Sequence, residues 1–133
     1  MNFYIGSGFY NIKNVRWLRD LLTREGHTHT YDWTLNVRVE SAEALREIGE
    51  KERDAITVSD FVVILLPAGK GSHVELGIAI GSGVPIFLHD TTDGMTNVET
   101  TSTFYHLSSV NQVTGPLEDI PRAITAYFTT ATR

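Results

Sequence analysis

Residues 60–80 read DFVVILLPAGKGSHVELGIAI, and this stretch decides the fold. The run from Phe61 to Leu66 is apolar at every position, which is typical of a strand covered on both faces in a parallel sheet. Pro67 and Gly69 end the strand, and a helix is expected from about residue 72 to 81. The stretch therefore predicts a buried strand, a glycine-rich turn and a helix start in direct succession.

Strand-like and helix-like segments alternate along the rest of the chain. This alternation predicts a single α/β domain over residues 1–133, with a flavodoxin-like parallel five-stranded sheet and helices on both faces. Ligands of such sheets bind beyond the carboxyl ends of the strands, which places the candidate site in the loops after the first four strands. The other strands are expected at residues 2–5, 27–31, 84–88 and 111–114, and the other helices at about 14–26, 41–59 and 116–127.

The composition excludes several classes of protein. With 41% hydrophobic and 20% charged residues, the 133-residue chain is expected to form a soluble globular domain. A net charge of −5 without a run of Lys or Arg argues against duplex nucleic acid as a partner. The absence of cysteine excludes disulfides and thiolate zinc sites, and the histidines show no metal-binding spacing, so no metal site is expected.

The chain shows no sign of a membrane or export segment. Its apolar runs are too short to span a bilayer, and the first residues do not resemble a signal peptide. A cytoplasmic location is therefore expected.

The glycine-rich turn of residues 69–75 carries the sharpest functional signal. Ser72 followed three residues later by Glu75 fits a capping box, which needs no substrate. The positive end of the helix also favours an ionised Glu75 at pH 7, as a reactive carboxylate requires. Lys70 and the backbone amides of Gly69 and Gly71 could bind a phosphate. Both interpretations, a helix cap and a site glutamate, are open at this point.

Two other loops should meet the same edge of the sheet. Asp32 and Trp33 follow the second strand, where they could hold a base or ribose, or form a turn with a half-buried ring. The turn after the first strand could bring backbone N–H groups close to a phosphate or sugar, or simply reverse the chain. This turn consists of Gly6, Ser7, Gly8 and Phe9.

Glu52 and Asp54 lie near the end of the predicted helix at residues 41–59. Most charged residues of that helix should form a solvated face, and for either residue alone this interpretation is favoured. The two side chains are not on the same face, so at most one of them points toward the site. A protonated acid there could donate to a leaving group.

These blocks resemble the nucleoside 2-deoxyribosyltransferase family, including its deoxynucleoside monophosphate N-glycosidase branch. The resemblance covers about residues 3–103 and is carried by the opening strand with Gly6-Ser7-Gly8, by SDFVV at 59–63 and by GSHVELG at 71–77. It implies that Glu75 attacks the anomeric carbon of a nucleoside or nucleotide. An acid at Glu52 or Asp54 would protonate the departing base.

The resemblance also implies how substrate and subunits are arranged. A 5′-phosphate would bind near Gly69, Lys70 and Ser72. A hydroxyl from the loop after the fourth strand, in the region of Thr101, Ser102 and Thr103, would complete the site of a neighbouring subunit. The implied protein is a homodimer or a larger homo-oligomer that needs no cofactor.

Two alternatives stay open from the sequence. One is a TIR-like NAD glycohydrolase, which would share the topology and the glutamate. The other is a non-catalytic nucleotide-binding or sensing module, in which Glu75 only caps a helix.

Overall fold

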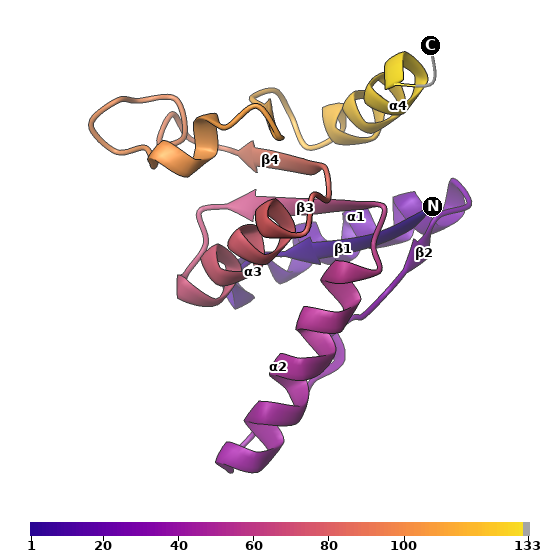
Figure 1. The fold of residues 1–133 in the computed structure, drawn as a ribbon, viewed down its shortest axis with the longest axis vertical. Helices are drawn as coiled ribbons and strands as arrows, with labels where there is room; N and C mark the ends of the chain where they lie inside the picture. Colours follow the sequence, from indigo (N-terminus) through magenta and orange to yellow (C-terminus); the bar gives the residue numbers. More distant parts are fainter. Residues whose placement is uncertain (132–133) are drawn as a thin grey trace.

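The computed structural model describes residues 1–131 and shows a fully parallel five-stranded sheet in the order β2-β1-β3-β4-β5 (Figure 1). This order confirms the predicted flavodoxin-like fold; the single-domain prediction extends two residues beyond the described part. The strands are β1 (Asn2–Gly6), β2 (Thr28–His29), β3 (Phe61–Leu66), β4 (Ile86–Asp90) and β5 (Val110–Val113). The helices are α1 (Ile12–Arg24), α2 (Ala42–Thr57), α3 (Lys70–Gly81) and α4 (Asp119–Ala131), with short 3-10 helices η1 (Phe9–Asn11), η2 (Trp33–Leu35) and η3 (Thr103–His106).

The two faces of the sheet pack against different helices, because successive strand residues point to opposite sides. Phe3 lies beside Phe61 in register, with ring centroids 5.9 Å apart, and Phe61 also contacts Phe128 of α4. Tyr4 and Gly6 alternate with these residues and face the opposite layer, where α2 and α3 pack against each other. In Figure 1, α3 lies in front of the sheet and α1 behind it.

Proline explains two boundaries that differ from the sequence-based prediction. β4 begins at Ile86, because Pro85 has no N–H to give to a strand ladder, and it continues to Asp90. His89 and Asp90 are therefore buried strand residues and not loop residues. α4 begins at Asp119, whose N–H bonds the carbonyl of Pro116 in a turn that precedes the helix.

Turns explain further differences between the expected and the observed boundaries of strands and helices. β2 is only two residues long, because the chain turns away into η2 at Asp32. α1 follows η1 directly and starts at Ile12, two residues before the expected start. In the described part of the chain, no helix has the length and apolar character needed to cross a membrane.

The start of α3 also differs, and this difference bears on the site. The helix begins at Lys70, and Gly69 is its N-cap, without a capping bond from a side chain. Ser72 is thus the third residue of the helix and is buried. The predicted capping box of Ser72 and Glu75 is wrong, because both residues lie inside the helix, beyond the position where a side chain caps it.

Candidate active site

A cavity of about 970 Å³ lies beside the carboxyl ends of β1 and β3, between α2 and α3. Its volume is at the upper end of the roughly 300–1,000 Å³ that small-molecule sites occupy. The residues predicted from the sequence that line it are Ser7, Gly8, Phe9, Trp33, Glu52, Gly69, Lys70, Gly71, Ser72 and Glu75.

Some predicted site residues do not line this cavity. Asp54 points to solvent, with 65% of its side chain exposed, and pairs with Arg53 at 3.0 Å. Asp32 pairs with Arg19 instead of facing the cavity. Ser102 caps η3 by accepting a hydrogen bond from the N–H of Phe104. Of the two candidate acids, the structure therefore brings only Glu52 to the cavity.

Glu75 lies on the buried stripe of α3. Ser72, Glu75, Leu76 and Ala79 recur at helical spacing, and these are the residues of the helix that are buried. Glu75 is only 9% exposed. The stripe thus carries a carboxylate into a position where an apolar residue would ordinarily pack.

Tyr4 joins the two glutamates. Its hydroxyl contacts Oε2 of Glu75 and lies 3.0 Å from Oε2 of Glu52. A tyrosine hydroxyl has one proton to donate, so it satisfies both contacts only when one carboxyl is protonated and donates to it. The geometry therefore favours a single shared proton on the pair of Glu52 and Glu75.

Burial raises the pKa of Glu75 to about 8. The hydrogen bond from Tyr4 opposes this shift, whereas hydrogen bonding and repulsion from Glu52 add to it. The expectation that Glu75 is an anion at pH 7, favoured by the helix dipole, is therefore wrong for the free protein. The sixth residue of α3 lies beyond the first turn, where the dipole acts most strongly. Burial and the adjacent carboxylates also hold the pKa of Tyr4 far above its usual range, so its hydroxyl stays protonated.

Gly6 makes room for the carboxylate of Glu75. A Cβ at this position would lie 2.7 Å from Oε1 of Glu75 and 2.7 Å from Cδ1 of Ile64. Because Tyr4 and Gly6 are two residues apart on β1, they share a face of the sheet. The strand therefore supplies both a hydroxyl for Glu75 and the space that the carboxylate occupies.

The turn after β1 is fastened to the end of β3. Ser7 donates through its hydroxyl to the carbonyl of Leu65 at 2.8 Å and accepts from the side-chain amide of Asn11 at 3.1 Å. The hydroxyl of Tyr10 donates to the carbonyl of Pro67. These bonds hold two cavity-lining turns together across neighbouring strands.

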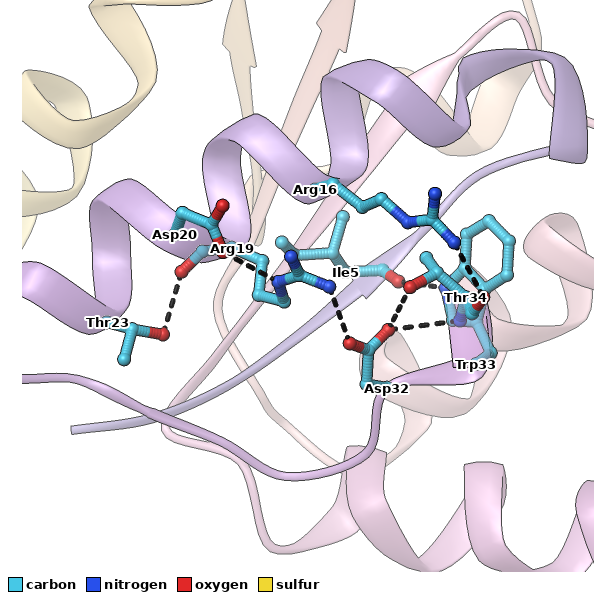
Figure 2. Close-up of polar contacts among 8 residues, drawn as sticks. All are labelled: Ile5, Arg16, Arg19, Asp20, Thr23, Asp32, Trp33 and Thr34. Atoms are coloured by element: carbon cyan, nitrogen blue, oxygen red, sulfur yellow. Dashed lines mark hydrogen bonds and ion pairs between the residues drawn. The ribbon is translucent and has the colours of Figure 1, made fainter. Parts of the chain in front are cut away.

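A network on the other side of the cavity fixes the indole of Trp33 (Figure 2). Its Nε1–H donates to the carbonyl of Ile5 at 2.7 Å. Asp32 accepts from the amide and hydroxyl of Thr34 and pairs with Arg19 at 2.8 Å. Although burial opposes ionisation, these hydrogen bonds lower the pKa of Asp32. Asp32 thus has a structural role that orients η2, and Trp33 forms part of the cavity wall.

The remaining wall has an apolar part and a basic part. Segment 36–39 and the facing turns of α2 contribute aliphatic side chains, and three basic side chains also reach the cavity. The aliphatic residues are Val37, Val39, Leu45 and Ile48, and the basic ones are Arg38, Arg53 and Lys70. The apolar part suits the flat face of a base, and the basic part suits an anionic group.

Sequence reasoning missed Tyr4 and segment 36–39. Tyr4 carries the one polar group in the strand FYI, which is a usable signal, because a buried hydroxyl needs a partner. Segment 36–39 offers no such signal, since its place over the cavity depends on the path of the chain. Among residues 1–131, no group of His, Asp or Glu side chains is arranged to hold a metal ion.

No protein-family model matches this chain, and no curated protein is similar enough to count as a relative. Solved structures share its fold, among them the following two. The CMP N-glycosidase of Clostridium botulinum has a TM-score of 0.67 and 15% identity, covering 94% of this chain and 99% of that one. The 2-deoxyribosyltransferase of the psychrotolerant Bacillus psychrosaccharolyticus has a TM-score of 0.66 and 18% identity, covering 90% of each chain. At these identities the likeness shows the fold.

The close approach of Gly6 to Glu75 predicts that Gly6→Ala perturbs the site. The added methyl group must displace the carboxylate or Ile64, and we expect a loss of about 1–3 kcal/mol in the free energy of unfolding, measured with urea. Gly77→Ala is the matched control: it lies in α3 with open space at its Cβ, and alanine is the better helix former. Equal effects of the two substitutions would contradict the proposed crowding.

The raised pKa of Glu75 predicts a pH-dependent effect of Glu75→Gln on stability. The neutral carboxyl stabilises the fold fully below its unfolded pKa of 4.5, and this contribution is lost as pH rises through about 8. The variant keeps a neutral side chain at every pH. The unfolding free energy of the variant relative to that of the parent should therefore increase between pH 4.5 and 8, by up to about 5 kcal/mol.

Urea unfolding at pH 4, 6, 8 and 9 measures this difference. The exposed Glu47→Gln, also in a helix, controls for the loss of one carboxylate. A constant difference between Glu75→Gln and the parent across this range would show that Glu75 has the same pKa in the folded and unfolded states.

Proposed function

We propose that this chain belongs with the nucleoside 2-deoxyribosyltransferases and N-glycosidases, and cleaves or transfers the N-glycosidic bond of a nucleoside or nucleotide. The observation that carries the proposal is the pair of the buried Glu75 and the partly buried Glu52 around the hydroxyl of Tyr4, in the wall of a ligand-sized cavity. The names of the two proteins that share the fold point in the same direction.

The shared proton of this pair suits the first chemical step. Glycosidic cleavage needs one ionised carboxylate and one protonated carboxyl. When a substrate displaces the resting arrangement, the shared proton passes from Glu75 to Glu52, which leaves Glu75 ionised. Glu75 attacks C1′, the bond from C1′ to the base nitrogen breaks, and the proton of Glu52 passes to the base.

The second step releases the sugar. The first step leaves a glycosyl ester on Glu75 and an ionised Glu52. Glu52 then removes a proton from water, whose oxygen attacks C1′ and frees Glu75; a second base as acceptor gives transfer instead. Tyr4 stays protonated throughout and stabilises the carboxylate of Glu75 each time it becomes a leaving group or a free anion.

The cavity wall suggests how a nucleotide would lie. The aliphatic side chains of segment 36–39 and α2, with Trp33, would cover the base. A 5′-phosphate would meet the start of α3, where Lys70 and the uncapped backbone N–H groups of the first turn line the cavity. The turn after β1, with Gly8 and Phe9, would border the sugar.

The mechanism predicts that Glu75→Gln abolishes release of free base, by roughly 10³-fold or more, without loss of the fold. Glu52→Gln should reduce the rate by roughly 10²-fold or more, and less for a substrate whose base leaves readily, because such a base needs little help from an acid. The assay is chromatography of free base from a panel of nucleosides, deoxynucleosides, their 5′-monophosphates and NAD.

Asp54→Asn is the matched control for Glu52→Gln, since it removes a carboxylate from the same helix at a position outside the cavity. Full activity of Glu75→Gln would refute the mechanism. Binding of a nucleotide with no turnover of any panel member would identify a non-catalytic binding module. Turnover of NAD alone would identify a glycohydrolase of the alternative class.

We also propose a homodimer or larger homo-oligomer. Ser102 does not line the cavity of its own chain, so a role in substrate binding requires the cavity of a neighbouring subunit. Segment 91–106 exposes apolar side chains, with Val98 89% and Phe104 60% exposed, which a subunit contact would cover. The cytoplasmic location expected from the sequence stays a prediction.

Light scattering after size-exclusion chromatography measures the oligomeric state. We expect a mass of at least two 14.8 kDa chains, and we expect Phe104→Glu to lower it toward one chain. The control Val58→Glu places the same charge at an exposed residue after α2. A parent protein of one-chain mass at micromolar concentration would contradict the oligomer.

A further inference from the structure

His73 connects the start of α3 to the segment after β4. Its Nδ1 lies 2.7 Å from the carbonyl oxygen of Gly69, and its Nε2 lies 2.6 Å from the hydroxyl of Tyr105. The ring itself does not line the cavity, whereas Gly69 does. A side chain outside the cavity thus holds a backbone group at its wall.

The two hydrogen bonds of the His73 ring determine which of its nitrogens carries a proton. A carbonyl oxygen only accepts, so Nδ1 of His73 must carry a proton and donate to Gly69. In a neutral ring Nε2 then accepts from the hydroxyl of Tyr105. When the ring is protonated, the same hydroxyl can rotate and accept instead. The bridge, by which we mean the two hydrogen bonds that join Gly69 to Tyr105 through His73, therefore persists in both charge states. Burial, with the nearby charge of Asp90, raises the pKa of Tyr105, which keeps its hydroxyl protonated.

The bond to Gly69 has a consequence inside the cavity. A peptide unit is planar and trans, so fixing the direction of its carbonyl fixes the N–H on the other side. The carbonyl of Gly69 shares its peptide unit with the N–H of Lys70. The helical bond that Gly69 accepts from the amide of His73 is long, at 3.3 Å, and the shorter bond from the ring supplements it.

The other end of the bridge is anchored to the sheet. Gln112 of β5 donates through its side-chain amide to the backbone carbonyl of Tyr105 at 3.0 Å. Tyr105 is itself only 8% exposed. The hydroxyl that holds His73 is therefore fixed in place and does not belong to a free loop.

We infer that His73 is a positioning residue for substrate binding, held by Tyr105, and that it orients the first turn of α3 toward the ligand. The inference rests on the proposed function for its kinetic test and on geometry alone for its structural test. Glu75 is held separately by Tyr4. Loss of the bridge should therefore weaken substrate binding and leave the chemical step nearly unchanged.

The test uses three substitutions in the full chain. His73→Ala removes both bonds, and Tyr105→Phe removes only the hydroxyl. His73→Asn retains a donor at the position of Nδ1 but cannot reach Tyr105. The controls are His27→Asn, which alters a histidine hydrogen-bonded to the N-terminal amine at the amino ends of the strands, and Tyr127→Phe, which removes a hydroxyl on α4.

The kinetic result expected for His73→Ala is a rise in KM of roughly threefold to tenfold, as loss of one or two hydrogen bonds implies, with kcat changed less than twofold. Tyr105→Phe and His73→Asn should each give a smaller rise. Adding Tyr105→Phe to His73→Ala should have no further effect, because the first substitution already removes the shared bond. An unchanged KM, or a loss confined to kcat, overturns the inference.

The structural result does not depend on turnover. Amide hydrogen exchange at Val74 and Glu75, followed by NMR, should accelerate in His73→Ala and Tyr105→Phe but not in the controls. If His73→Ala fails to fold, Tyr105→Phe decides. If the parent turns over no substrate, the proposed function fails and exchange alone decides; unchanged exchange in both variants then overturns the inference.

Discussion

The burial of one carboxylate is the constraint on which the site depends. Glu75 lies on the apolar stripe of α3, where ionisation is costly and where the nearest polar groups are the hydroxyl of Tyr4 and a second carboxyl. Loss of the shared proton destabilises the fold at high pH, yet the same pair of carboxyl groups would supply the acid and the nucleophile of the proposed glycosidic reaction. Stability and function thus make opposite demands on the same residue.

The fold was largely predictable because the signals are local. The fully apolar run at residues 61–66 requires cover on both faces, and the alternation of strands with helices leaves few topologies for a parallel sheet. The element ends were less predictable, since they depend on competing turns. Ser72 and Glu75 have the spacing of a capping box, but the chain enters the helix two residues earlier, at Lys70.

The site was predictable in part. Glu75 and Glu52 could be selected by residue type and position, but their relation depends on Tyr4, which approaches from a strand far away in sequence. Asp54 and Glu52 could not be separated from the sequence, because only the rotation of α2 decides which one faces the cavity. The bond from His73 to Gly69 is local, whereas its contact with Tyr105 requires the tertiary fold.

Segment 36–39 joins no strand of the sheet, yet it forms a wall of the cavity. The carboxylates and Tyr4 come from β1, α2 and α3, which the core holds in place independently of that segment. Under the proposed function, ligand preference and bond-breaking chemistry are therefore physically separable in this scaffold. Exchanging those few residues offers a way to redirect the scaffold to other ligands while its reactive centre stays intact.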